Sequence, residues 1–193
     1  ELNKQIKLIS KDNLIFSLIK DKKEAYLIGN DSCSYDIIIP TSIKHENQEY
    51  FITVIKESSF KDSQQIRSIR FSPESRLRTI EKEAFAHSSI ESIFIPSNVS
   101  EICERTFYQC TKLQIVKIPK NSQLKKIGKE GFARSSIKSI SIPPNLTRIY
   151  EKTFYNCNQL KTVEIPQESK LEVFETDSFA ESSIESIFVP SHV

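Results

Sequence analysis

Apolar residues return along this chain in one fixed order, at intervals of 23 or 24 residues. In each copy, apolar residues at the first, fourth and sixth positions are followed by a proline. A second group of apolar residues follows the proline and ends at a Phe. The stretch 113–157 contains two successive copies of this order. The first residues of the copies are Ile66, Ile90, Leu113, Ile137, Leu160 and Ile184. Such a period indicates a repeat array in which each copy is stabilised by its neighbours.

The spacing within one copy predicts its secondary structure. Alternation before the proline predicts a short strand, which the proline ends because it has no N–H to donate to a ladder. Four mostly polar residues separate two apolar anchors, as between Ile149 and Phe154, and predict one or two turns of helix. This period and apolar order are the signature of a leucine-rich repeat. The expected fold is therefore α/β: a leucine-rich-repeat solenoid with a parallel, concave β-sheet and short helical turns on the convex side.

The first 33 residues do not repeat, and we expect residues 1–33 to form an N-terminal cap. Two apolar stretches, Leu14–Ile19 and Glu24–Ile28, flank a polar tip and predict a β-hairpin that covers the edge of the first coil. Residues 34–193 then form an array of about six and a half coils that ends midway through a copy. We expect the native polypeptide to continue, since an open strand edge after Val193 would allow self-association.

The first coil contains about eight more residues than the next coil between its proline, Pro40, and the following apolar residue, Ile52. This difference predicts an inserted loop at residues 41–51, because insertions in solenoids map to loops on one face. Ordinary elaboration of the first coil and a role in recognition both explain such a loop.

The charge balance narrows the choice of partner. The chain has 27 basic and 25 acidic residues, for a net charge of +2, which argues against nucleic acid or an anionic membrane surface as the main partner. Its apolar runs are too short to span a bilayer, and no signal segment precedes them. We therefore expect no membrane insertion by this segment.

The cysteines are expected to be structural. Cys110 and Cys157 occupy the same repeat position two copies apart, which places them roughly 10 Å apart for strands ~4.8 Å apart. A disulfide needs Cα atoms within about 7 Å, so we expect free, buried thiols and no disulfide. Cys103 is expected to be more exposed. No C-x-x-C motif occurs and the histidines fall at unrelated repeat positions, so we expect no metal or other cofactor. The remaining cysteine and the histidines are Cys33, His45, His87 and His192.

Three Asn-x-Ser/Thr sequons begin at Asn30, Asn98 and Asn145. They would carry glycans if the protein were secreted by a eukaryote. Asn98 and Asn145 are copies of one position, and chance occurrence explains the three sequons equally well.

The residues between the inward-facing ones predict an outer face with its own pattern. At the second position, opposite charges are expected to pair between neighbouring strands, as for Arg67 with Glu91 and for Lys161 with Glu185. Apolar residues stand at the third and fifth positions among polar ones, and we expect these to be exposed anchors for a partner. Tolerated surface residues or self-association contacts are the alternative. The candidate binding residues are Phe94, Ile115, Phe188, Arg70 and Lys117.

The order I-x-I-P-x-x-V/L-x-x-I-x-x-x-x-F-x-x-C/S-x-x-L, seen in Val163–Pro166 and Ile149–Leu160, resembles the BspA-like leucine-rich-repeat family. That family occurs in surface proteins of anaerobic bacteria and of some parasitic protists. The resemblance covers about residues 14–193. The family often has Gly after the Ile that precedes the predicted helical turn, and here only Gly128 follows this habit.

The resemblance implies a non-enzymatic, protein-binding module of a cell-surface or secreted adhesin that contacts host cells, extracellular matrix proteins or other microbes. No nucleophile, phosphate-binding or paired-carboxylate motif points to an enzyme. The alternative is an intracellular scaffold protein, which the free cysteines and the missing signal segment favour slightly.

Overall fold

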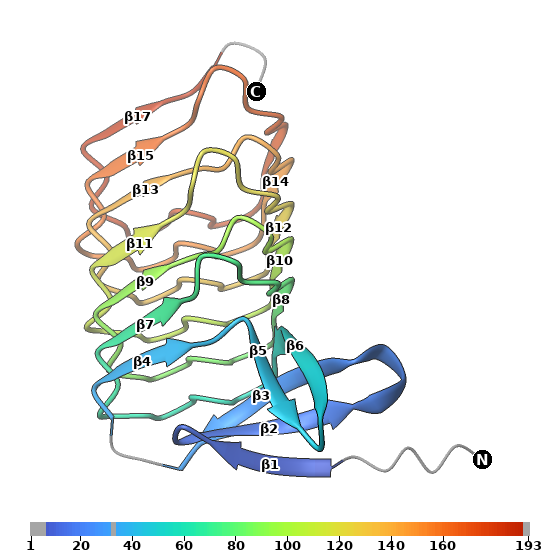
Figure 1. The fold of residues 1–193 in the computed structure, drawn as a ribbon. Helices are drawn as coiled ribbons and strands as arrows, with labels where there is room; N and C mark the ends of the chain where they lie inside the picture. Colours follow the sequence, from blue (N-terminus) through green and yellow to red (C-terminus); the bar gives the residue numbers. More distant parts are fainter. Residues whose placement is uncertain (1–6, 32–33, 191–193) are drawn as a thin grey trace.

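A computed structural model describes residues 7–31 and 34–190 and shows the coils stacked into a column (Figure 1). Two rows of parallel strands run along this column. The front row comprises β4 (Asp36–Ile39), β7 (Ser68–Phe71), β9 (Ser92–Phe94), β11 (Ile115–Lys117), β13 (Ser139–Ser141), β15 (Thr162–Glu164) and β17 (Ser186–Phe188). The back row comprises β6 (Gln48–Ile55), β8 (Thr79–Ile80), β10 (Glu101–Ile102), β12 (Lys126–Ile127), β14 (Arg148–Ile149) and β16 (Val173–Phe174). The front row is the predicted parallel sheet, and the back row was not predicted.

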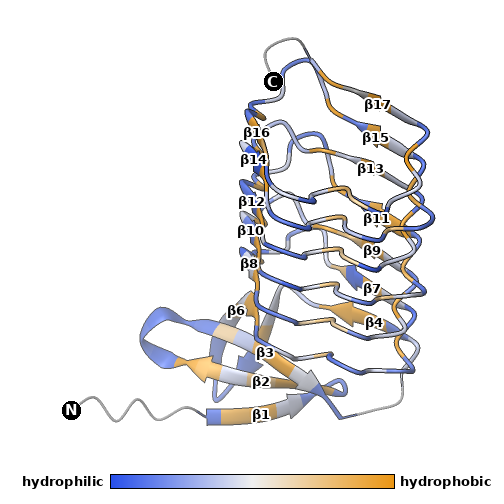
Figure 2. Ribbon diagram, turned by 180° about the vertical axis from the view of Figure 1, so that it is seen from behind, coloured by the Kyte–Doolittle hydropathy of each residue, from blue (hydrophilic) through white to orange (hydrophobic). Residues whose placement is uncertain are grey.

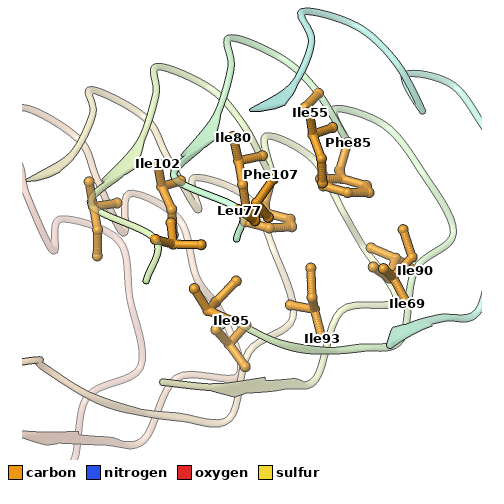
Figure 3. Close-up of a cluster of buried hydrophobic side chains, with 14 of the residues drawn as sticks. Ile55, Ile69, Leu77, Ile80, Phe85, Ile90, Ile93, Ile95, Ile102 and Phe107 are labelled. Carbon is orange, nitrogen blue, oxygen red and sulfur yellow. The ribbon is translucent and has the colours of Figure 1, made fainter. Parts of the chain in front are cut away.

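The core lies between the two rows, because the second residue of each front strand from β4 to β15 and the last residue of each back strand from β6 to β14 are buried. Figure 3 shows Ile69 and Ile93 from the front row facing Ile80 and Ile102 from the back row. The register pairs like with like: Ile69 lies beside Ile93, and Ile80 beside Ile102. Figure 2 shows the resulting alternation of hydrophobic and hydrophilic residues along each coil. Each core residue therefore packs on its own counterpart in the next coil, which explains the sequence period.

The third side of each coil is a series of overlapping turns, which we call the turn ladder. Its segments are 56–63, 81–88, 103–110, 128–135, 150–157 and 175–182. In the segment 81–88, the N–H groups of Glu83, Phe85 and His87 donate to carbonyl oxygens of the next coil at 3.1, 2.9 and 2.8 Å. Other segments repeat this pattern, as in the bonds from Phe107 to Gly131 at 2.8 Å and from Phe132 to Thr153 at 2.9 Å.

The prediction of helical turns on this side was wrong. Glu83 and His87 have φ angles of 52° and 59°, and each turn-ladder segment has such residues four positions apart. An α-helix cannot pass through left-handed residues, and its N–H groups would bond within the segment rather than to a neighbour. In the described residues, the only helix is the short 3₁₀ turn η1 (Lys20–Lys22).

A stack of phenylalanine rings fills the interior behind the turn ladder. Successive ring centroids lie 5.0–5.6 Å apart, with planes within 9° of parallel. The stacked residues are Phe60, Phe85, Phe107, Phe132, Phe154 and Phe179. All but the last are fully buried, so the stack joins the coils through dispersion contacts along the column.

The turn ladder also crosses a point where both strand rows are interrupted. Among the described residues, β11 forms no strand pairing with β13, and β12 forms none with β14. At the same interface the N–H groups of Phe132 and Arg134 still donate to Thr153 and Tyr155 at 2.9 and 2.8 Å. The turn ladder is thus the more continuous connection between these coils.

The N-terminal segment forms an antiparallel sheet of β1 (Lys7–Lys11), β2 (Leu14–Ile19) and β3 (Glu24–Asn30). The predicted hairpin is present as β2 and β3, while β1 was not predicted. Strand β3 pairs in parallel with β6 and so extends the back row beyond the first coil (Figure 1). The expected boundary at residue 33 lies outside the described residues and stays a prediction.

The insertion at residues 41–51 is a β-hairpin rather than the predicted loop. Strand β5 (Ser42–His45) pairs antiparallel with the first part of β6. The two turn residues, Glu46 and Asn47, have φ angles of 49° and 61°. Two consecutive left-handed residues match the twist of the flanking strands, as in a type I′ turn.

Candidate functional site

The outer face of β4, β7, β9 and β11, which we call the front face, carries exposed apolar side chains beside two cations that pair with no described residue. Its register places Ile38 beside Arg70, and Phe94 beside Lys117. Since Ile69 is paired with Ile93, Arg70 and Phe94 follow on neighbouring strands. The order across the four strands is therefore apolar, cationic, apolar, cationic.

Phe94 and Ile115 are both 51% exposed, although Phe94 follows the buried Ile93 and Ile115 precedes the buried Val116. Ile115 is paired with Ser92, two residues before Phe94, so the two side chains lie diagonally across β9 and β11. Exposed apolar residues on adjacent strands form a local patch rather than scattered surface positions.

The structure adds Ile38 to this patch, with 65% of its surface exposed, and Tyr35 at its margin with 56%. Neither was predicted. The signal was present, because Ile38 occupies the same position in the run Ile37-Ile38-Ile39-Pro40 as Phe94 does in Ile93-Phe94-Ile95-Pro96.

Arg70 and Lys117 are exposed, and neither side chain forms an ion pair or a hydrogen bond with another described residue. Their neighbour Arg67 differs: its guanidinium lies 3.9 Å from Glu91 and 4.8 Å from the centroid of the Tyr35 ring. Asp36, on the same face, accepts a hydrogen bond from the hydroxyl of Ser68. Arg70 and Lys117 are thus positive charges without an internal counterion on this face.

A hollow opens at the carboxyl ends of β7 and β9. Its volume is about 210 Å³, and its walls are largely apolar. The lining residues are Phe71, Phe94, Pro73, Pro96, Pro119, Ser72, Ser75, Ser97 and Asn121. Sites for drug-sized ligands are usually about 300–1,000 Å³, so this hollow suits a single side chain better than a metabolite. The nearby Asn98 amide donates to the carbonyl oxygen of Ser75 at 2.8 Å and ties the two coils together.

Many charged side chains on the turn ladder and the back row form ion pairs. On the turn ladder, the Glu83 carboxylate lies 2.6 Å from Lys61 and 3.2 Å from Arg105. Arg105 also contacts Glu130, at 3.3 Å. The hydrogen bond from Lys61 lowers the pKa of the Glu83 carboxyl below its usual value. On the back row, Lys126 pairs with Glu101 at 2.8 Å and Arg148 with Glu175 at 2.7 Å. These pairs bridge successive coils.

The predicted cross-strand ion pairs form. Lys161 lies 2.7 Å from Glu185, and Arg67 lies 3.9 Å from Glu91. The remaining candidate, Phe188, lies on β17, which β13 and β15 separate from the front face. Its side chain is outside the described part of the structure. The fold therefore brings together Phe94, Ile115, Arg70 and Lys117, and their role in binding stays a prediction.

The described cysteines, Cys103, Cys110 and Cys157, are free. Cys110 and Cys157 are fully buried, and their thiols donate to the carbonyl oxygens of Phe85 and Phe132 at 3.0 and 3.2 Å. Burial raises the pKa of Cys110 to about 12 and that of Cys157 to about 11. Thiols of this kind are poor nucleophiles and act as structural residues. Cys33 lies outside the described residues.

The sequon asparagines Asn98 and Asn145 make equivalent contacts. The amide nitrogen of Asn145 donates to Ser122 at 3.0 Å, as that of Asn98 does to Ser75. These amides are the attachment atoms for a glycan. Glycosylation at Asn30, Asn98 or Asn145 stays a prediction, and Ser32 of the first sequon lies outside the described residues.

Other kinds of site were sought in residues 7–31 and 34–190. No helix there is long and apolar enough to cross a membrane. No group of three or more His, Cys, Asp or Glu side chains in these ranges is placed to hold a metal ion.

The fold is shared with solved bacterial structures. A leucine-rich repeat protein from Bacteroides ovatus superposes with a TM-score of 0.74 at 24% identity, over 88% of this chain and 47% of its own. A leucine rich cell surface protein from Faecalibacterium prausnitzii gives a TM-score of 0.63 at 21% identity, over 97% and 49%. The leucine rich repeat protein of T. pallidum gives 0.68 at 15% identity, over 82% of both chains.

The chain thus spans about half the length of the first two proteins. At these identities the likeness shows the fold alone. No curated protein matches the sequence.

The family is shown by a sequence profile that covers most of the chain. A profile described as "BspA type Leucine rich repeat region" matches in six copies, over residues 28–124 and 78–193. Together with the stacked coils, this match identifies the chain as a member of the BspA-type leucine-rich-repeat family.

Proposed function

We propose that this chain is a non-enzymatic protein-binding module and that the front face is its contact surface. The observation that carries the proposal is the group of exposed apolar residues, Phe94 and Ile115, beside two cations without a counterion, Arg70 and Lys117. Side chains of this kind dominate the energetics of protein interfaces, where aromatic residues and Arg are enriched. A rigid column of coils holds them in fixed positions before a partner arrives, which lowers the entropic cost of binding.

We further propose that the module belongs to a cell-surface or secreted adhesin. Family membership supports this location, as does the similar fold of a protein described as a cell surface protein. The partner would then be a protein of a host surface, of the extracellular matrix or of another microbe. Labelling of intact cells of the native organism tests the location. A protein that is labelled only after lysis would contradict it.

Binding of the purified chain to immobilised matrix proteins and to intact host cells tests the contact surface. We expect the F94S/I115S variant to bind at least about tenfold more weakly, because it removes two anchors from one patch. The matched control is E101A/K126A, which removes an ion pair from the back row and should bind like the wild type. A folded F94S/I115S variant with unchanged binding would remove the front face from the proposal.

A further inference from the structure

We propose that the front face holds an acidic, extended segment of the partner in the polyproline II conformation. The segment would lie across the strands, along the column, with carboxylates on Arg70 and Lys117 and an apolar side chain in the hollow beside Phe94. This inference rests on the proposed function and names the chemistry of the partner.

The spacing of the cations fits this conformation. Arg70 and Lys117 lie on β7 and β11, with β9 between them. Neighbouring strands are about 4.8 Å apart, so the two positions are roughly 9.6 Å apart. A polyproline II helix has three residues per turn and a rise of about 3.1 Å per residue, so equivalent side chains recur every ~9.3 Å. Glutamates at every third residue would therefore meet Arg70 and Lys117 in turn.

The apolar residues have the same spacing. Ile38 and Phe94 lie on β4 and β9, again two strands apart, and alternate with the two cations. A segment with an apolar residue at every third position would contact both, while its acidic residues contact Arg70 and Lys117. An extended strand is a poorer match, because its residues on one face recur every ~6.8 Å.

The hollow supplies a place for one side chain of the segment. Aromatic and proline side chains line it, including Phe71, Phe94 and Pro96. Grooves lined by aromatic residues are the common receptors for proline-rich segments, whose preformed conformation lowers the entropic cost of binding. The volume of about 210 Å³ suits a single aliphatic side chain.

The local charge favours an acidic segment over a basic one. Of the anions on the front face, Glu91 is paired with Arg67, while Asp36 accepts a hydrogen bond from Ser68 and lies on β4, at the end of the strand order. Arg70 and Lys117 keep their charge available. An acidic segment would satisfy both, whereas a basic segment would meet repulsion at the two positions.

The test uses labelled synthetic peptides and fluorescence anisotropy with the whole chain. The probe contains four Glu-Pro-Leu triplets, and the control peptides replace Glu by Lys or Leu by Ser. We expect the acidic peptide to bind, and both control peptides to bind at least about tenfold more weakly. R70A/K117A should weaken binding of the acidic peptide about tenfold, and F94S by a similar factor.

The matched control variant is K126A/R148A, which removes the same net charge from the back row and should bind the acidic peptide as the wild type does. Equal losses for K126A/R148A and R70A/K117A would overturn the inference, because net charge alone would then explain binding. Equal binding of the Lys-containing peptide would also overturn it. If no peptide binds while F94S/I115S still loses partner binding, the peptide chemistry is wrong and the proposed contact surface stands.

Discussion

The turn ladder and the front face are built from the same repeat, yet they use their side chains in opposite ways. On the turn ladder, phenylalanines stack on phenylalanines, buried thiols donate to carbonyl oxygens, and Glu83 and Arg105 join ion pairs across several coils. On the front face, Phe94 and Ile115 are half exposed, and Arg70 and Lys117 have no counterion among the described residues. The side chains of the turn ladder hold the coils together, whereas we expect the outward side chains of the front face to contribute little to cohesion.

Both sides join neighbouring coils through backbone hydrogen bonds, so the difference lies in their side chains. In the turn ladder, N–H groups of residues such as Glu83 and Phe85 find their acceptors in the next coil. A side chain that disturbs this spacing breaks hydrogen bonds as well as packing. The front strands are paired in the same way, but their outward side chains are exposed, so we expect these to change without loss of the pairing.

The largest expected effect is the loss of a ring from the phenylalanine stack. Phe107 is fully buried between Phe85 and Phe132, with ring centroids 5.2 and 5.0 Å away. F107A should lower the free energy of unfolding by about 3–5 kcal/mol, because it leaves a cavity between three coils. Urea unfolding followed by circular dichroism measures this. F107L, which refills part of the cavity, should lose clearly less, and equal losses would contradict the role of the stacked ring.

A smaller effect is expected at Gly128, where the turn ladder approaches the preceding coil closely. An added Cβ would lie 2.6 Å from the backbone nitrogen of Glu104 and 2.8 Å from the carbonyl carbon of Cys103. G128A should therefore destabilise the fold by about 1–3 kcal/mol. Gly29 is the matched control, since its added Cβ would meet only one atom at 3.5 Å. If G128A were as stable as G29A, the prediction would be wrong, because the backbone near Gly128 would then shift to accommodate the Cβ at little cost.

The buried thiols predict a loss of stability in alkali. Burial raises the pKa of Cys110 to about 12 and of Cys157 to about 11, above the value of about 8.5 in an unfolded chain. Groups with raised pKa contribute their full stability below pH ~8.5 and lose it as the pH rises through the folded-state pKa. From pH 9 to 11 the free energy of unfolding should fall by at most about 1.4 kcal/mol per thiol per pH unit.

The C110S/C157S variant isolates this contribution. Serine already occupies the same repeat position at Ser88 and Ser135, so we expect the variant to fold. Its free energy of unfolding should depend less on pH between 9 and 11 than that of the wild type. Identical slopes for the two proteins would contradict the assignment of the alkaline loss to these thiols.

A still smaller effect is expected from the ion pairs of the turn ladder. Arg105 contacts Glu83 and Glu130, and its guanidinium lies 4.2 Å from the centroid of the Tyr108 ring. R105A should lower the free energy of unfolding by only about 0.5–1 kcal/mol, because these groups are partly exposed to solvent. The loss should shrink in 1 M salt, since screening weakens exposed pairs. A salt-independent loss would assign the effect to packing on Tyr108 instead.

The repeat itself could be predicted from the sequence because each inward residue packs on its counterpart one coil away. The period of 23 or 24 residues thus located the front strands, the prolines that follow them and the exposed positions of Phe94 and Ile115. The turn ladder was misread as helix, because a spacing of five residues between Ile149 and Phe154 suits either structure. The feature that distinguishes these turns from a helix is a left-handed φ at residues such as Lys152. Such a φ cannot be recognised in the sequence when the residue is not a glycine.

The candidate site was predictable only in part. Strand alternation identified Phe94, Ile115, Arg70 and Lys117, but the hollow beside Phe94 arises from turns of three coils that meet only in space. The lack of a counterion at Arg70 and Lys117 also depends on the register of neighbouring strands. Ile38 was not predicted, although it occupies in the first coil the position that Phe94 occupies in a later one.

The central claim is that the front-face side chains are not needed to hold the coils together, and urea unfolding of F94S/I115S tests it most directly. Both residues are half exposed, so the account predicts a change in the free energy of unfolding within about 0.5 kcal/mol of zero. The F107A variant, measured in parallel, should show the large loss given above. A loss of about 2 kcal/mol or more in F94S/I115S would contradict the claim, because the exposed patch would then be part of the cohesion of the column.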